Sequence, residues 1–238
     1  MRNGGKFIVK NEKKEKVENE IKDLSYMDEL PTEWFGFSYC KEMCIRGDFY
    51  DLYSYTNEQS HRSITVYYHE ETSEYKLRVK IGLTEFCRIE YIAGNLAMFE
   101  SVLRKQFSDM LHDMAEFNMN TISCIVKEKK ILEWDYIKNM PETIEGFVLF
   151  IRPDQPVKVI NGSYIVFAYC DFEAESDFII YYNVFRDEFF GEARVNKIPE
   201  MNYTFDSTEL SELEEKLDQY LVPRLKEIRQ CIRKQGSM

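Results

Sequence analysis

The sequence has no long apolar run and no leader-like beginning. No stretch approaches the roughly 18 consecutive apolar residues of a membrane-spanning helix. The first residues are polar and lack the apolar core of a secretory signal. The six cysteines are scattered along the chain and form no disulfide framework. These absences predict a soluble, cytoplasmic protein whose thiols stay reduced.

The signatures of common enzyme classes are missing as well. The three histidines, His61, His69 and His112, form no metal-binding pair on one element. Cys40 and Cys44 lack the second cysteine pair that would complete a zinc site. No Gly-x-Ser-x-Gly segment occurs, and the ten glycines form no phosphate-binding loop. The sequence therefore predicts no cofactor, no metal and no catalytic residues, although its 42 acidic residues leave acid–base pairs open without singling one out.

The chain is acidic and rich in aromatic side chains. Its 238 residues carry a formal net charge of −11, which repels phosphate backbones and anionic membranes. Aromatic residues make up 15% of the chain, with 16 Tyr and 17 Phe. Such residues are typical of β-strands, and exposed tyrosines can also anchor a protein partner or stack on bases. Because base stacking normally comes with a positive groove, the charge disfavours nucleic acid.

The two halves of the sequence resemble each other. Residues Ile64–Met114 align without a gap with Phe178–Ile228 at an offset of 114. The 51 aligned pairs include seven identities, against roughly three or four expected from composition alone. The pattern of apolar positions also agrees between the two segments, and both place strand-like stretches before a helix. Upstream, Pro31, Gly36 and Phe37 match Pro141, Gly146 and Phe147 at an offset of 110.

Hydrophobic periodicity assigns elements to each half. The Tyr75–Ile81 segment alternates apolar residues with Lys76, Arg78 and Lys80, which is typical of a strand with one wet face. We expect strands at residues 34–40, 49–55, 61–69, 75–81 and 86–92, and again at 147–151, 164–172, 178–184, 190–195 and 201–205. Apolar stripes predict helices at 10–24, 94–116 and from 210 onward. Residues 1–5 are expected to be disordered, and 121–134 to form a connecting helix or strand.

These elements predict an α+β fold. The expected architecture is an internal duplication of a helix–five-stranded antiparallel sheet–helix unit, forming a pseudo-dimer. The first copy is expected to span residues 1–134 and the second residues 135–238.

One acidic segment is a candidate binding site. Four carboxylates stand at alternate positions: Asp171, Glu173, Glu175 and Asp177. In an extended segment they would share one face and attract a cation or a basic partner. The alternative interpretation is a solvated turn between two strands. The first half carries Asn57, Gln59, His61 and Ser63 at the matching positions, so such a site would belong to the second half alone.

Two tyrosine pairs are the other candidate. In a strand, one member of each pair, Tyr67–Tyr68 and Tyr181–Tyr182, faces the core while the other faces outward. An outward Tyr67 or Tyr181 would suit a protein interface, and the alternative is a structural role on the sheet.

These observations favour a non-enzymatic binding or adaptor protein that acts through protein–protein contacts. Its partner is expected to be another protein, basic in charge, and not a membrane. Two alternatives stay open: a small-ligand-binding or regulatory protein with a pocket between the copies, and single-stranded nucleic-acid binding on the sheets.

Overall fold

The computed structural model describes residues 15, 17–22 and 24–235. The chain divides into two compact units, Met1–Ile81 with Glu85–Glu116 and Gly82–Thr84 with Phe117–Met238. The division therefore falls before the predicted boundary at residue 134. Residues 17–22 are helical. The expected disorder at residues 1–5 and most of the expected helix at 10–24 lie outside the described residues.

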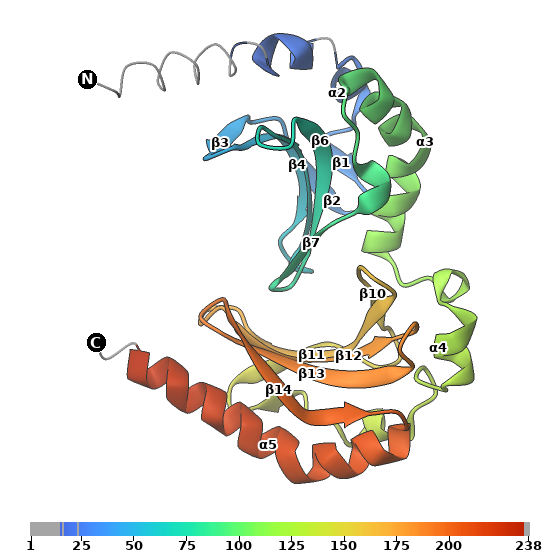
Figure 1. The fold of residues 1–238 in the computed structure, drawn as a ribbon, viewed down its shortest axis with the longest axis vertical. Helices are drawn as coiled ribbons and strands as arrows, with labels where there is room; N and C mark the ends of the chain where they lie inside the picture. The colour runs from blue at the N-terminus through green and yellow to red at the C-terminus, as the bar shows by residue number, and fades with distance from the viewer. Residues whose placement is uncertain (1–14, 16, 23, 236–238) are drawn as a thin grey trace. The chain divides into compact units, whose positions relative to one another are not determined.

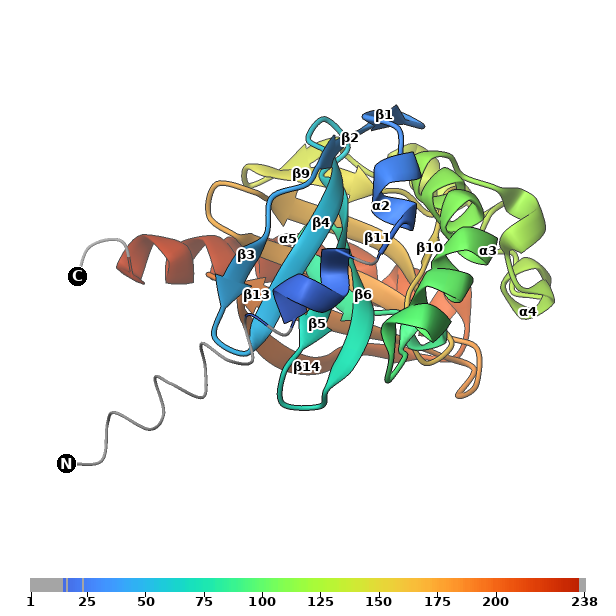
Figure 2. The ribbon, with the colours of Figure 1, turned by 90° about the horizontal axis from the view of Figure 1, so that it is seen from above.

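The first unit is an antiparallel sheet with its helices on one side (Figures 1 and 2). Its strand order is β1-β2-β4-β5-β6-β7, and β3 pairs with β4. The elements are α2 (Tyr26–Glu29), β1 (Glu33–Trp34), β2 (Phe37–Cys40), β3 (Cys44–Arg46), β4 (Phe49–Asn57), β5 (Arg62–His69), β6 (Glu74–Ile81), β7 (Thr84–Cys87) and α3 (Leu96–Ala115). A 3-10 turn at Ile89–Tyr91 lies between β7 and α3.

Helix α3 covers one face of this sheet. Asn95 caps the helix, because its side chain accepts a hydrogen bond from the Met98 amide. The Phe107 ring then packs against the rings of Tyr53 and Tyr55 from β4. The helix predicted at 94–116 is confirmed, and its buried positions are Phe99, Leu103, Phe107, Met110, Leu111 and Met114.

The second unit repeats this arrangement. Its sheet has the order β14-β13-β12-β11-β9-β8, and β10 pairs with β11. The elements are α4 (Cys124–Glu128), β8 (Thr143–Ile144), β9 (Phe147–Ile151), β10 (Val157–Lys158), β11 (Ser163–Asp171), β12 (Ser176–Asn183), β13 (Glu188–Val195), β14 (Ile198–Ser207) and α5 (Leu210–Gln235). In the connector that the sequence left open, α4 is a short helix, 3-10 turns lie at Met119–Thr121 and Asp135–Asn139, and no strand forms in this described part of the chain.

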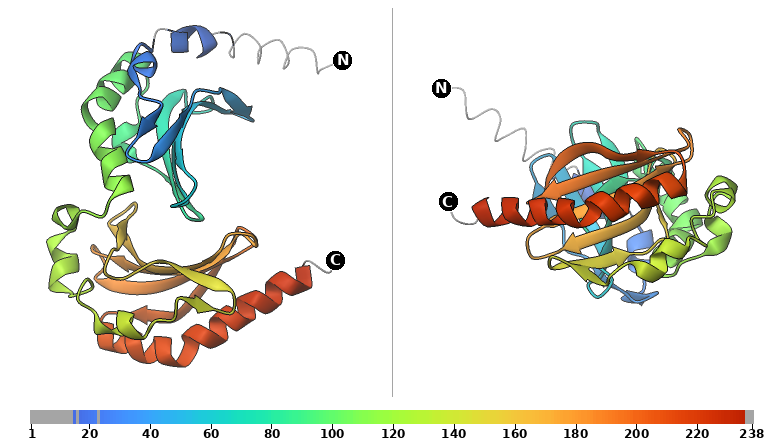
Figure 3. Two further views of the ribbon diagram at one scale, coloured as in Figure 1. Left: turned by 180° about the vertical axis from the view of Figure 1, so that it is seen from behind. Right: turned by 90° about the horizontal axis from the view of Figure 1, so that it is seen from below.

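Helix α5 lies across one face of the second sheet (Figure 3). One buried cluster joins its leucines to side chains of the sheet and of the preceding connector. The connector residues Ile122, Val126, Ile131 and Trp134 belong to this cluster, which explains why they fall in the second unit. The helix continues through Pro223.

The two units share strand register as well as element order. Equivalent cross-strand pairs and equivalent bulges are separated by 114 residues throughout the central hairpins. Examples are Ile64–Val79 with Phe178–Ala193, and the irregularity at Asp51–Tyr53 with that at Ile165–Phe167.

The fold is a mixed α+β structure with two antiparallel sheets. The predicted number of strands was wrong, because each sheet has seven strands rather than five. The strands that were not anticipated are only two or three residues long and are too short to show an alternating pattern. Among the described residues, no helix combines the length and apolar character needed to cross a membrane.

Candidate functional site

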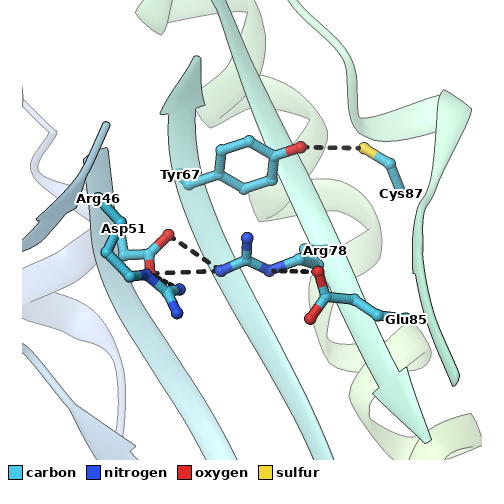
Figure 4. Close-up of polar contacts among 6 residues, drawn as sticks. All are labelled: Arg46, Asp51, Tyr67, Arg78, Glu85 and Cys87. Carbon is cyan, nitrogen blue, oxygen red and sulfur yellow. Dashed lines mark hydrogen bonds and ion pairs between the residues drawn. The ribbon is translucent and has the colours of Figure 1, made fainter. Parts of the chain in front are cut away.

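The candidate site lies on the face of the first sheet opposite α3. Strand β6 buries Tyr75, Leu77, Val79 and Ile81 on the helix side, which turns Lys76 and Arg78 to the other face. There Arg78 meets side chains from three more strands (Figure 4). We name this group the Asp51 cluster, and it comprises Arg46, Asp51, Tyr67, Arg78, Glu85 and Cys87.

Asp51 is the buried centre of the cluster. It stands on β4 at the irregularity before Tyr53, directly across from Tyr67 on β5, and is 8% exposed. Two guanidinium groups bind its carboxylate. Arg46 Nη2 donates to Oδ2, and Arg78 Nη2 lies 3.1 Å from Oδ1 and 3.3 Å from Oδ2. A buried carboxylate is stable only when it is paired in this way.

Arg78 connects the remaining members. Its guanidinium lies 5.1 Å from the centre of the Tyr67 ring, within the range of a cation–π contact. Its Nε is 3.5 Å from Glu85 Oε1 on β7. The Tyr67 hydroxyl donates a hydrogen bond of 3.7 Å to Cys87 Sγ. Arg78 is therefore held by Asp51, by Glu85 and by the Tyr67 ring (Figure 4).

An aromatic rim borders the cluster. The Phe49 ring stacks on His69, with centroids 4.5 Å apart and planes 7° apart, and lies 5.8 Å from Tyr67. Phe49 is 37% exposed, and Arg46, its cross-strand neighbour on β3, has a side chain that is 61% exposed. The exposed part of this face thus combines an aromatic ring with a guanidinium group.

Arg46 and Tyr67 are hydrogen-bond donors of the cluster. The hydrogen bond to Asp51 raises the pKa of Arg46, so this side chain keeps its charge. Burial, with the hydrogen bond to Cys87, raises the pKa of Tyr67, so the phenol keeps its proton at neutral pH. The carboxylate of Asp51 is engaged by two cations.

Within the described residues, no group of three or more His, Cys, Asp or Glu side chains is placed to hold a metal ion. The arginines of the Asp51 cluster occupy the positions around the carboxylate that a cation would need.

The four acidic residues of the second unit do not share a face. Strand β11 ends at Asp171 and β12 begins at Ser176, so the segment is a hairpin turn. Asp171 binds Arg229 at 2.6 Å, and Glu175 binds Lys197 at 2.6 Å. Asp177 is buried at 1% exposure, whereas Glu173 is exposed.

The two candidate tyrosines occupy equivalent positions in the two units. Tyr67 belongs to the Asp51 cluster, and Tyr181 stacks on Phe190 with centroids 5.1 Å apart. Tyr182 points into the buried cluster on the α5 side, which places Tyr181 on the opposite face. Both Tyr67 and Tyr181 are only 6% exposed, so neither presents a free ring face.

Sequence reasoning did not anticipate Asp51, Arg46 or Glu85. One signal was present, because Asp51 is the only charged residue in the aromatic run of residues 49–55. Its partners could not be read from the sequence, since they depend on the bulge in β4 and on the short strand β3.

Comparison of the chain with protein families, with curated proteins and with solved structures gave no match.

Proposed function

We propose that this protein is a non-enzymatic binding protein that acts through protein–protein contacts, with the Asp51 cluster and Phe49 at the centre of its contact surface. The observation that carries the proposal is that Arg46 is both ion-paired and exposed. Its guanidinium is ion-paired to buried Asp51, yet its side chain is 61% exposed and neighbours exposed Phe49. Arginine and aromatic residues dominate the energetics of protein interfaces.

Preorganisation supports the same proposal. Arg46 and Arg78 are fixed by a common carboxylate, and Phe49 is fixed by its stack on His69. A side chain that is already ordered loses little conformational entropy when a partner binds. The side chains of this surface therefore lose their conformational entropy during folding and not when a partner binds.

The net charge of the whole chain supports a basic partner. A net charge of −11 attracts a basic protein at long range and accelerates encounter. At the surface itself, Glu85 supplies a carboxylate whose side chain is 52% exposed. We therefore propose a basic protein partner. The acidic turn at 171–177 is a weaker candidate for its contact, because three of its four carboxylates are paired or buried within the second unit.

We further infer that the two units are copies of one helix–antiparallel sheet–helix unit, so that the chain corresponds to a fused dimer of that unit. Support comes from the constant separation of 114 residues between equivalent pairs and bulges. A cytoplasmic location belongs to the same proposal. It is supported by the six cysteines, all of which are free thiols.

Affinity capture with matched variants tests the proposed function. Arg46→Ala and Phe49→Ala remove the two exposed contact groups. Arg88→Ala is the arginine control, because Arg88 pairs locally with Glu90 outside the cluster. Phe185→Ala is the aromatic control, because Phe185 is 80% exposed in the second unit.

We expect a stoichiometric partner to be captured by the wild type and by both controls, and capture to fall at least about tenfold for each cluster variant. The variants must first show wild-type circular dichroism and melting. Equal capture by all five proteins would contradict the proposal.

A further inference from the structure

Asp177 is a buried carboxyl group whose surroundings do not offset the cost of removing its charge from water. It stands on β12 of the second unit, where it pairs across the sheet with Cys170 on β11 and with Arg194 on β13. The residue is 1% exposed, and neither of its side-chain oxygens has a hydrogen-bond partner of normal geometry. A fully buried carboxylate in this condition carries a large desolvation penalty, whereas a neutral carboxyl does not.

The nearest cation does not compensate for this burial. Arg194 Nε lies 3.7 Å from Asp177 Oδ1, which is too long for a hydrogen bond. The same Nε lies 3.5 Å from Glu192 Oε1, so two carboxylates compete for one guanidinium. Neighbouring Ser176 offers no help, because its hydroxyl donates to the Ala174 carbonyl and accepts from the Asn196 amide.

The position of Asp177 gives its charge a structural consequence. The turn between β11 and β12 ends at Ser176, so Asp177 belongs to the second cross-strand pair of the hairpin. Loops and the residues beside them can open locally at a lower free-energy cost than the core of a sheet. Opening here would hydrate an ionised Asp177 without disrupting the helix-side core of the unit.

We propose that Asp177 is a proton-controlled switch: with its proton it seals the end of the β11–β12–β13 sheet, and on ionisation it opens that end to water. The ionisable groups of this proposal lie on β11, β12 and β13, apart from the Asp51 cluster.

The other ionisable groups near Asp177 are Cys170, Tyr181, Arg194 and Glu192. Burial raises the pKa of the Cys170 thiol well above its usual value, and burial likewise raises the pKa of Tyr181, so both stay neutral. Arg194 stays cationic, and Glu192 is the remaining carboxylate. For Asp177, burial raises the pKa to about 7, with Arg194 opposing the shift. Its proton is therefore exchanged within the physiological range.

Hydrogen–deuterium exchange tests the switch in the full-length protein. Peptides that cover residues 163–183 would be followed at pH 5 and pH 8, with correction for intrinsic exchange. Asp177→Asn keeps the shape and cannot ionise. Glu173→Gln is the matched control, because Glu173 is an exposed carboxylate in the same hairpin turn.

We expect wild-type protection of this hairpin to fall by more than about tenfold from pH 5 to pH 8, and by up to about a hundredfold if the full pKa shift is expressed. Glu173→Gln should behave as the wild type, and Asp177→Asn should show equal protection at both values. Wild-type protection that does not change with pH, or an Asp177→Asn variant that keeps the wild-type change, would overturn the proposal.

A titration of the wild-type carboxyl carbon by NMR keeps the test decisive if the variant fails to fold. An Asp177 resonance that titrates near pH 7 supports the switch, whereas titration near the ordinary aspartate value of about 4 refutes it.

Discussion

The Tyr55 hydroxyl donates a hydrogen bond of 2.6 Å to the carbonyl oxygen of Pro31. The second unit repeats the contact, since the Tyr169 hydroxyl donates to the Pro141 carbonyl at 2.7 Å. Both tyrosines lie at the centre of their sheets and are 0% exposed. Each therefore ties the segment that enters the sheet to a central strand, in a contact that requires the phenol oxygen.

Removing this oxygen should destabilise either unit by a similar amount. Tyr55→Phe and Tyr169→Phe each leave a carbonyl without its donor, and we expect the free energy of unfolding to fall by about 1 kcal/mol in each case. Chemical denaturation measures this change.

Tyr53→Phe is the matched control, because the Tyr53 hydroxyl is buried without a hydrogen-bond partner. This change should be neutral or stabilising, since an unsatisfied hydroxyl costs free energy in the core. Equal destabilisation by Tyr53→Phe and Tyr55→Phe would show that the hydrogen bond from Tyr55 to Pro31 does not stabilise the fold.

Asp51→Asn should destabilise the first unit strongly. The change leaves Arg78 with a neutral partner at a site where both side chains are largely buried, at 16% and 11% exposure. We expect a loss of about 3 kcal/mol in the free energy of unfolding. Thermal and urea unfolding would measure it.

Asp28→Asn provides the comparison for an exposed ion pair. Asp28 binds Lys41 at 2.7 Å, but its side chain is 74% exposed. The change should therefore alter stability by less than about 1 kcal/mol. A comparable loss in the two variants would mean that Asp51 is not buried as described.

Gly146→Ala should also be unfavourable. Gly146 has a φ of +83°, and an added Cβ would lie 2.8 Å from Arg229 Nη2. Arg229 contacts the Glu145 carbonyl, the Asp171 carboxylate and the Phe147 ring, so it cannot move away freely. We expect a loss of about 1–2 kcal/mol from the backbone alone.

Gly94→Ala is the control for this substitution. No atom lies within 4 Å of an added Cβ at Gly94, and its φ is not in the left-handed region. Its melting temperature should stay close to that of the wild type. A larger effect at Gly94 than at Gly146 would be inconsistent with the described turn.

The stability of the second unit should depend on pH through Asp177. The folded carboxyl, with a pKa of about 7, holds its proton more tightly than the unfolded one at about 3.9. Stability from this group is therefore complete below about pH 4 and is lost as the pH rises to about 7. The free energy of unfolding of Asp177→Asn should exceed that of the wild type by on the order of 3 kcal/mol at pH 8. The difference should vanish near pH 4. Denaturation at several pH values measures this difference. A difference in stability between Asp177→Asn and the wild type that does not depend on pH would contradict the prediction.

The sequence was informative where a repeating pattern exists. The alternation of residues 75–81 predicted β6 and its wet face, and the apolar stripes predicted α3 and α5. These features follow from local periodicity. The end of the first unit at Glu116 does not, because it depends on where the apolar residues of the connector pack.

The candidate site was harder to anticipate, because it depends on register. Alternation placed Arg78 on the wet face, but only the bulge at Asp51 brings that carboxylate within 3.1 Å of it. The acidic residues at 171–177 showed the opposite problem. Their spacing suggested one face, but a turn between Asp171 and Ser176 separates them.

Photo-crosslinking at position 49 tests the central claim most directly. A photoreactive phenylalanine analogue would replace Phe49 in one protein and Phe185, the exposed control, in another. If the face around the Asp51 cluster binds a protein, irradiation in a lysate of the source cells will give a discrete covalent adduct from position 49 and not from position 185. The adduct should be lost when Arg46→Ala is added. No adduct at position 49, or the same adduct from both positions, would contradict the account.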